Sequence, residues 1–379
     1  MHNKYTVKKI EKKHDHLSIS WNDNFRSKFH FLWLRDNCPT AIHPSANMRV
    51  FNILTVSKKI FPKKINLEKS QLNIDWSEGN HRSNFSLKWL RDHCYTAINK
   101  KKYISPYFFW NGKLKKNFNK IKLDHDKILK DDKHLKKWLS LLHSYGFAIV
   151  KNSPTKKKSG FKILNRISHH RETFFGTPFE VINIPKPNNT AYTADALRNH
   201  TDLPYFEYAP GYQFLHCLVN NASGGNSSVV DGFAVADYLR KKEKDVFRLL
   251  TKTYVKFKDT DYTQKAIRIL HSPIITLNKD NDFNDIRFSM AAMGAVDVDP
   301  SKMKKFYEAY QYFASLLQNN NFKIDFRLES GDIFCFNNRR VLHGRTEFDP
   351  NSGNRHLQGY YIERDEVIAR LNYFNNLKV

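Results

Sequence analysis

The first hundred residues repeat one alternation of hydrophobic and polar positions. Apolar and polar side chains alternate along Leu17–Trp21, and they do so again along Leu72–Trp76. A period of two residues is typical of half-buried β-strands. Each alternation is followed by a nearly identical segment, Trp33–Ile42 in the first copy and Trp89–Ile98 in the second. We therefore predict a small β-rich N-terminal domain over residues 1–103, built from two similar lobes.

A helical period replaces this alternation beyond a Lys- and Asn-rich connector, which we place at 104–120. Apolar residues recur at helical spacing over 132–145, between two Asp residues that suit a helix start and Gly146, which suits a helix end. The apolar run Phe147–Val150 predicts a buried strand. A second helix is predicted over 161–174.

Short strand-like segments dominate the rest of the chain. They are Tyr212–Leu218, Ser228–Asp231, Tyr254–Phe257, Ile274–Leu277, Ile286–Met290, Asp332–Phe336 and His356–Glu363. Helical patterns interrupt them at 234–252 and 301–319. Many short strands with intermittent helices favour a double-stranded β-helix, or jelly-roll, domain. The sequence thus predicts a mainly β protein with flanking helices, in which residues 121–379 form this domain.

The composition excludes several classes of protein. Hydrophobic residues make up 40% of the 379 positions and aromatic residues 14%, so the chain can bury a core and is not disordered throughout. No stretch approaches the roughly 20 apolar residues of a membrane span. The lysines within Met1–His16 precede no apolar run of the kind that a secretory signal has. With four scattered cysteines, we expect reduced thiols in a cytoplasmic protein that has no membrane partner.

The net charge of +26 is open to two interpretations. One is a nucleic-acid partner, and the other is a lysine-rich surface that keeps the protein soluble. The basic clusters are Lys8–Lys13, Lys100–Lys102, Lys113–Lys116 and Lys156–Lys158. These clusters are short and dispersed, and no nucleic-acid-binding motif accompanies them. We therefore favour the lysine-rich surface and expect no nucleic-acid partner.

Candidate chemistry lies in two histidines and one aspartate. His200 and Asp202 are two positions apart, so in extended chain their side chains point to the same side. His343 follows the apolar strand Ile333–Phe336, which places it at a strand end. Two His and one carboxylate are the ligand set of non-haem Fe(II) oxygenases, and they leave coordination positions open for a co-substrate and O₂. The alternatives are a hydrogen-bonded loop histidine at 200 and a core or surface histidine at 343.

An arginine downstream of His343 strengthens the oxygenase hypothesis. Arg355 begins a predicted strand, and its planar guanidinium can bind a carboxylate with two parallel hydrogen bonds. A dicarboxylate that chelates iron through its keto-acid end needs such a partner for its other end. Ser227, after the Gly224–Gly225 turn, adds a hydroxyl that could help to hold it.

These segments, taken together, resemble the γ-butyrobetaine dioxygenase family, a branch of the taurine dioxygenase-like 2-oxoglutarate oxygenases. The matching segments, in family order, are Trp33–Pro39, Asn189–Thr193, His200–Pro204, Pro210–Cys217, Val230–Phe233, Asn338–Arg345 and Arg355–Tyr361. The resemblance implies a small N-terminal domain, a double-stranded β-helix catalytic domain and a homodimer. It also implies that Fe(II) is bound by His200, Asp202 and His343, and that 2-oxoglutarate and O₂ are co-substrates.

The resemblance further implies an aromatic box for a trimethylammonium group. A quaternary ammonium cannot donate a hydrogen bond, so ring faces are its natural hosts. By motif alignment the box comprises Phe175, Phe179, Tyr192 and Tyr361. The family commonly has Tyr and Trp at the two Phe positions, which flank Gly176 at the end of the second predicted helix. Ordinary core packing is the alternative for these two Phe residues.

The chain departs from the family pattern at two places. The family often binds zinc through three Cys and a distant His, whereas this chain has Cys38, Thr40, His43 and the distant His81. Because structural zinc takes four ligands and Thr is not one of them, we expect no zinc; the alternative is a degraded site of Cys38, His43 and His81. Leu203 stands where animal members have a Tyr that helps to hold the substrate carboxylate, although Asn189 is retained.

The sequence therefore predicts a 2-oxoglutarate-dependent hydroxylase of a small trimethylammonium compound. The preferred substrate is γ-butyrobetaine, which would give L-carnitine. The same chemistry on trimethyllysine or on a trimethylamino phosphonate is the first alternative. A basic nucleic-acid-binding protein with a coincidental His-x-Asp motif is the alternative from another class.

Overall fold

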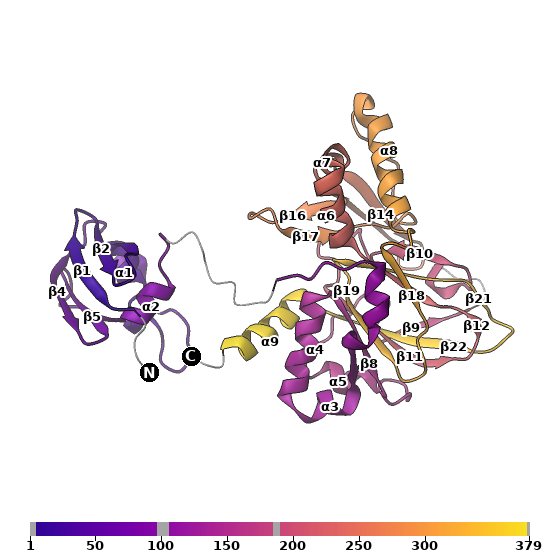
Figure 1. The fold of residues 1–379 in the computed structure, drawn as a ribbon, viewed down its shortest axis with the longest axis horizontal. Helices are drawn as coiled ribbons and strands as arrows, with labels where there is room; N and C mark the ends of the chain where they lie inside the picture. The colour runs from indigo at the N-terminus through magenta and orange to yellow at the C-terminus, as the bar shows by residue number, and fades with distance from the viewer. Residues whose placement is uncertain (1–4, 97–105, 185–189, 377–379) are drawn as a thin grey trace. The chain divides into compact units, whose positions relative to one another are not determined.

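The computed structural model describes residues 5–96, 106–184 and 190–376. The chain divides into two compact units, Met1–Lys101 and Lys102–Val379 (Figure 1). None of the helices within the described ranges is both long and apolar enough to cross a membrane. The sequence prediction of a mainly β protein with flanking helices is confirmed.

The described part of the first unit contains two three-stranded antiparallel sheets, each followed by a short helix. The first sheet and its helix are β1 (Val7–Lys12), β2 (His16–Trp21), β3 (Arg26–His30) and α1 (Phe31–Asp36). The second set is β4 (Pro62–Glu68), β5 (Gln71–Trp76), β6 (Arg82–Ser86) and α2 (Leu87–Asp92). The two predicted alternations are thus the central strands β2 and β5.

Equivalent tryptophans show how closely the two sheets correspond. The indole nitrogen of Trp21 donates to the hydroxyl of Ser27 at 2.8 Å, and that of Trp76 donates to the hydroxyl of Ser83 at 2.8 Å. All four side chains are buried. Because a buried indole N–H must find an acceptor, the same Trp–Ser pair recurs in both sheets. The apolar sides of both sheets form one core.

The second unit has the double-stranded β-helix fold that the sequence predicted. Its larger sheet has the strand order β7 (Lys122–Asp124), β8 (Phe147–Lys151), β19 (Ile333–Asn337), β11 (Tyr212–Asn220), β22 (Arg355–Ile362) and β9 (Phe179–Ile182). Its smaller sheet has the order β10 (Leu197–His200), β20 (Val341–Arg345), β13 (Ser227–Asp231) and β18 (Lys323–Phe326). Buried side chains from both sheets, such as Phe334 and Val229, share one core cluster, so the sheets pack face to face.

Helices cover the larger sheet on the side away from the smaller one. They are α3 (His125–Lys130), α4 (Asp132–Ser144), α5 (Gly160–Leu164) and α9 (Arg364–Asn376). The helix predicted over 132–145 is α4, and its N-cap Asp131 accepts a hydrogen bond from the backbone N–H of His134 at 2.7 Å. Leu135, Trp138 and Leu142 pack with the strands of the sheet. The predicted period and cap are therefore confirmed.

A second group of elements lies beside the smaller sheet (Figure 1). It contains α6 (Gly232–Lys242), α7 (Lys244–Lys252), α8 (Pro300–Leu316) and the hairpins β14 (Val255–Asp261) with β15 (Ala266–Ser272) and β16 (Ile275–Leu277) with β17 (Phe283–Ile286). The single helix predicted over 234–252 is wrong, because Glu243 leaves the helical region at φ −133° and ψ 63° and separates α6 from α7. The remaining elements are short: β12 (Ser223–Gly224), β21 (Phe348–Asp349), and the 3₁₀ helices Pro39–Ala41, Ile53–Thr55, Gly112–Ile121 and Thr190–Tyr192.

Two further sequence predictions are wrong, and both errors have the same physical cause. The helix expected over 161–174 ends at Leu164, because the backbone N–H of Arg171 instead donates to the carbonyl of Tyr361 in β22 at 2.9 Å. The strand expected over 286–290 ends at Ile286, because Phe288 exchanges hydrogen bonds with Thr201. In each case a pairing distant in sequence replaces the locally predicted element.

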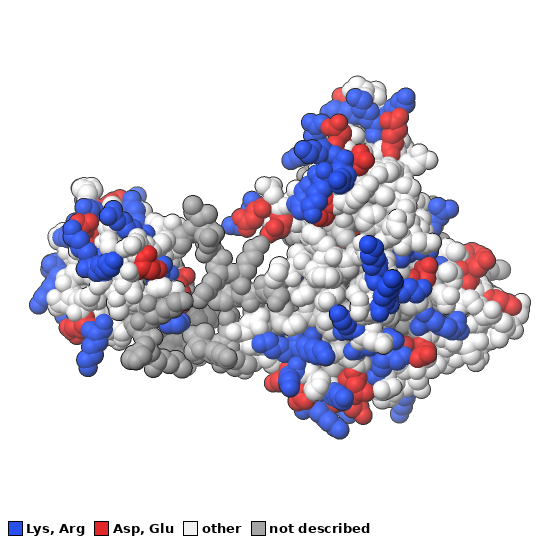
Figure 2. All heavy atoms as spheres, viewed as in Figure 1, with Lys and Arg blue, Asp and Glu red and all other residues white. Residues whose placement is uncertain are grey.

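Figure 2 shows Lys and Arg spread over the face in view and interspersed with Asp and Glu. Several of the basic residues are also paired: Lys151, for example, contacts both Glu329 and Asp332. This distribution is typical of a charged, solvated surface.

Candidate active site

Antiparallel pairing of two strands brings His200 and His343 together. His200 ends β10, and His343 lies directly opposite it in the middle of β20. Directly opposed residues of antiparallel strands project from the same face, and the two ring centroids are 4.4 Å apart. The expectation that His343 stands at a strand end is wrong, because the residues after the Arg339–Arg340 turn form β20 itself.

Asp202 completes the cluster. Its Oδ1 atom lies 3.2 Å from Nε2 of His200 and 3.7 Å from Nε2 of His343. Over the described parts of the chain, this is the one group of three or more His, Cys, Asp or Glu side chains whose ligand atoms are mutually within 4.8 Å. Two imidazole nitrogens and one carboxylate oxygen converging on one point fit a ferrous ion.

The cluster is held in place by hydrogen bonds to the aspartate and its backbone. The hydroxyl of Tyr361 donates to Oδ2 of Asp202 at 2.7 Å. The side-chain carbonyl of Asn338 accepts from the backbone N–H of Asp202 at 2.7 Å, and its NH₂ group donates to the Asp202 carbonyl at 3.0 Å. Leu203, the next residue, has a left-handed φ of 52°. These contacts orient one carboxylate oxygen towards the histidines.

Sequence reasoning missed this supporting role of Asn338 and the second role of Tyr361. Both residues lie in segments that carry the family resemblance, Asn338–Arg345 and Arg355–Tyr361. This resemblance was the only feature of the sequence that could have indicated these roles, because the hydrogen bonds join Asp202 to residues far away in the sequence.

The pKa shifts of His343 and Asp202 suit a metal ion. Burial, and then the neighbouring His200, lower the pKa of His343 to about 3, so its ring is neutral near pH 7. Burial alone would raise the pKa of Asp202, but His343 and His200 hold it well below its ordinary value, with help from Tyr361. A neutral imidazole and an ionised carboxylate are the forms that bind metals.

The side chain of Arg355 carries a positive charge that no acidic side chain of the described structure balances. Among the described residues its guanidinium has no acidic partner, and its Nε atom is buried without a hydrogen bond. Burial lowers its pKa to about 10, so it still carries a charge near pH 7. Gly225 leaves the room that this side chain needs, since a Cβ there would lie 3.1 Å from Cδ and Nε of Arg355. A half-buried, unpaired guanidinium is a ready site for a carboxylate.

The neighbourhood of Arg355 includes a second guanidinium. Arg345 is buried, and its pKa falls to about 10 because of burial and then the charge of Arg355. It donates to the carbonyls of Thr193 and Asp195, both at 2.7 Å, and so ties down the chain beside Tyr192. Ser227, the predicted hydroxyl partner, is buried at the start of β13 and lies opposite Arg345.

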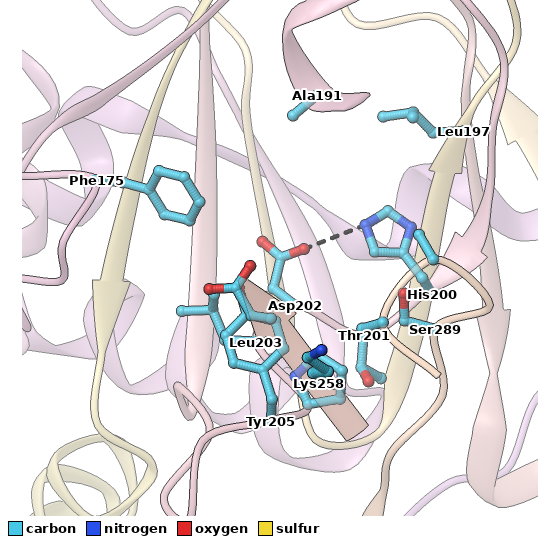
Figure 3. Close-up of a pocket in the computed structure, with 14 residues that line it drawn as sticks. Phe175, Ala191, Leu197, His200, Thr201, Asp202, Leu203, Tyr205, Lys258 and Ser289 are labelled. Carbon is cyan, nitrogen blue, oxygen red and sulfur yellow. Dashed lines mark ion pairs between the residues drawn. The ribbon is translucent and has the colours of Figure 1, made fainter. Parts of the chain in front are cut away.

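The pocket in Figure 3 is lined by two residues of the cluster, His200 and Asp202, and by one residue of the predicted substrate site, Phe175. His200 and Asp202 border it together with Phe175, Tyr205 and Lys258. Leu203 is among the lining residues too, where it offers only an apolar surface.

Three of the four predicted aromatic residues form a continuous row. The ring centroids of Phe175 and Phe179 are 6.1 Å apart, and Phe179 stacks on Tyr361 at 5.0 Å. Tyr192 is half-buried in the 3₁₀ helix Thr190–Tyr192 and makes no ring contact with that row in the described structure. The expected helix end at these Phe residues is wrong: Phe179 begins β9, and Phe175 precedes it in a loop. Asn189 lies outside the described residues.

The residues of the suggested zinc site are only partly brought together. The thiol of Cys38 lies 3.3 Å from Nε2 of His81 and 3.2 Å from the hydroxyl of Thr40. Nδ1 of His43 instead accepts from the backbone N–H of Ala46 at 3.1 Å. The presence or absence of zinc here stays a prediction.

A double-stranded β-helix that presents two histidines, one aspartate and a half-buried, unpaired arginine defines a non-haem, 2-oxoglutarate-dependent oxygenase. The model of the taurine catabolism dioxygenase TauD, TfdA family matches residues 111–361, and a γ-butyrobetaine hydroxylase-like N-terminal model matches residues 8–91. The chain therefore belongs to the TauD, TfdA family. The predictions of a dioxygenase and of Fe(II) and 2-oxoglutarate as its cofactor and co-substrate are confirmed.

Several relatives align over almost the whole of this chain. γ-Butyrobetaine dioxygenase of Pseudomonas sp. (strain AK-1) is 36% identical over 360 residues, which cover 94% of this chain and 92% of that protein. Human γ-butyrobetaine dioxygenase is 31% identical, with 94% and 93% covered. Mouse mitochondrial trimethyllysine dioxygenase is also 31% identical, with 94% and 85% covered. Among solved structures, AAD-2 in complex with Mn(II) and N-oxalylglycine shares the fold with a TM-score of 0.50 and 14% identity, over 63% of this chain and 92% of that one.

Proposed function

We propose that the protein hydroxylates γ-butyrobetaine to L-carnitine. The observation that carries this proposal is the position of Tyr361, which stacks on the Phe175–Phe179 row and also donates to Asp202. A row of ring faces thus leads directly to the metal-binding cluster. Relatives that are named γ-butyrobetaine dioxygenases and align over almost the whole chain support the same substrate.

Each residue has a distinct role in this proposal. His200, Asp202 and His343 hold Fe(II), and Arg355, with Ser227, binds the far carboxylate of 2-oxoglutarate. Fe(II) and 2-oxoglutarate, once held by these residues, would supply the oxidative chemistry for hydroxylating a C–H bond with O₂, with succinate and CO₂ as co-products. The protein's part is to hold the substrate so that one carbon faces the cluster.

The substrate-facing residues set that position. Phe175, Phe179, Tyr192 and Tyr361 present π surfaces to the trimethylammonium group, and Asn189 contributes to the other end of the molecule. Tyr361 stays protonated, because burial and the charge of Asp202 raise its pKa well above the ordinary value. It can therefore orient the iron ligand and offer its ring face at the same time.

Trimethyllysine is the second candidate substrate, because trimethyllysine dioxygenases align over almost the whole chain as well. It carries the same cationic head on a longer chain.

We also propose a homodimer, a cytoplasmic location and the domain limits 1–103, 104–120 and 121–379. Light scattering of the purified protein tests the dimer.

A substrate panel tests the function. Purified protein is given Fe(II), 2-oxoglutarate and either γ-butyrobetaine, trimethyllysine or no substrate, and succinate and the hydroxylated product are measured. We expect product with γ-butyrobetaine and succinate above the level without substrate. Product from trimethyllysine alone would replace the proposed substrate. No turnover, together with salt-dependent binding to RNA or DNA, would favour the nucleic-acid alternative.

A further inference from the structure

Lys258 is a cation that lines the same pocket as the metal-binding cluster and is not used by anything described so far. It lies in β14 and borders the pocket together with His200, Asp202 and Leu203. Among the lining residues that the structure describes, it is the one Lys or Arg. The pocket is therefore bordered by a basic side chain that the aromatic row and the iron ligands do not explain.

The charged residues next to Lys258 in β14 form ion pairs, whereas the ammonium of Lys258 forms none among the described residues. Lys256 pairs with Asp297 at 3.3 Å, and Asp259 accepts from Arg268 at 2.9 Å. The Lys258 ammonium has no acidic or hydrogen-bond partner among the described residues. Asp259 also lines the pocket, but Arg268 neutralises its charge. A cation without a counter-ion at the edge of a binding pocket favours an anionic ligand.

The backbone fixes where this ammonium is presented. The N–H of Lys258 donates to the carbonyl of Ala292 at 2.7 Å, which joins β14 to the loop that carries Ala291 and Ala292. That loop lines the pocket with small apolar side chains and offers no charge of its own. In Figure 3, Phe175 and Lys258 are drawn on opposite sides of Asp202.

We propose that Lys258 binds the carboxylate of the trimethylammonium acid and thereby sets which carbon faces the cluster. This inference rests on the proposed function and specifies its anionic end. With the cation at the aromatic row and the carboxylate at Lys258, the methylene groups between the two charges lie across the cluster. Leu203 itself offers the acid no hydroxyl, and the ammonium of Lys258 supplies a charged contact instead. Lys258 is a specificity-determining residue in this arrangement.

The test compares an acid with its neutral amide. KM and kcat are measured for γ-butyrobetaine and for its carboxamide with the unchanged enzyme, Lys258→Met, Lys258→Arg and the control Lys252→Met, which changes an exposed lysine at the end of α7. We expect Lys258→Met to raise KM for the acid by about tenfold, the range of one charge-assisted hydrogen bond. KM for the amide should not change, Lys258→Arg should retain most of the affinity for the acid, and Lys252→Met should change neither.

Salt gives a second measurement that loss of structure would not mimic. Lys258 is exposed, and raising the ionic strength screens an exposed ion pair, so KM for the acid should rise with salt in the unchanged enzyme and much less in Lys258→Met. If Lys258→Met weakens acid and amide equally, or neither, the assignment of Lys258 is overturned while the proposed function stands. If the unchanged enzyme turns over no trimethylammonium acid, the proposed function itself is overturned, and this assignment with it.

Discussion

The metal-binding cluster and the substrate-facing wall of the same pocket are built in different ways. In the cluster, His200 and His343 are opposed across paired strands, and Asp202 is fixed by Asn338 and Tyr361. On the wall, Phe175 comes from a loop and Lys258 from the outer hairpin β14–β15. The two histidines are thus part of the smaller sheet, whereas Phe175 and Lys258 are carried by elements attached to the sheets.

This difference separates the chemistry from the choice of substrate. Groups on paired strands keep their geometry when loops change, so a fold can retain one reaction while loop residues select the molecule that undergoes it. Substitutions in the cluster should therefore affect every substrate alike, and substitutions in the wall should affect substrates unequally.

The largest effect is expected for His343→Ala. Removing one of three ligands should lower turnover by at least about a hundredfold, with γ-butyrobetaine and with any other accepted substrate. Succinate formation and iron content of the purified protein measure the loss. His271→Ala, at an exposed position of β15, is the matched control and should keep both. An iron-loaded, active His343→Ala protein would contradict the ligand assignment.

Arg355→Lys should come next. The substitution keeps the charge but loses the two parallel hydrogen bonds, so KM for 2-oxoglutarate should rise by roughly tenfold to a hundredfold. KM for γ-butyrobetaine should change little, which a pair of substrate titrations shows. Arg248→Lys, on the exposed side of α7, is the control. If only the γ-butyrobetaine KM rises, Arg355 belongs to the substrate wall rather than to the co-substrate site.

Tyr361→Phe tests the residue that belongs to both regions. The substitution removes the hydroxyl that donates to Asp202 but keeps the ring on Phe179, so Fe(II) should bind about tenfold more weakly. Titration of activity with Fe(II) measures this change, and KM for γ-butyrobetaine at saturating iron should shift less. Tyr307→Phe, at an exposed position of α8, serves as the control. Unchanged iron affinity would mean that the Tyr361 hydroxyl does not orient Asp202 for the metal.

The metal-binding cluster could be predicted from the sequence because its residues lie in short, continuous motifs. The spacing of His200 and Asp202 is local, and the segment around His343 resembles the family as a continuous run. The double-stranded β-helix followed from many short apolar strands, and α4 followed from its period and its Asp131 cap. These features depend on neighbours along the chain, which a single sequence displays.

The features that the sequence did not reveal depend on contacts between distant segments. The chain around Phe175 leaves the predicted helix because Arg171 pairs with Tyr361, and Lys258 reaches the pocket because β14 is joined to Ala292. Asn338 contacts Asp202 through a turn between two strands. No periodicity records such pairings, so the wall of the pocket could be predicted only through family resemblance.

The smallest effect is expected for Phe175→Leu, which removes one half-buried ring face from the wall. A cation–π contact at such a site contributes about 0.5–1 kcal/mol, so KM for γ-butyrobetaine should rise by about threefold. Binding of 5,5-dimethylhexanoate, in which carbon replaces the charged nitrogen, should change less, because Leu keeps an apolar surface. Phe25→Leu is the matched control: this half-buried ring belongs to the first unit, and the guanidinium of Arg91 lies 3.8 Å from its centre, so this face is not free for the substrate. Equal losses for the charged and the neutral compound would show that Phe175 contributes packing alone, and the cation would then have to be assigned to Phe179, Tyr192 and Tyr361.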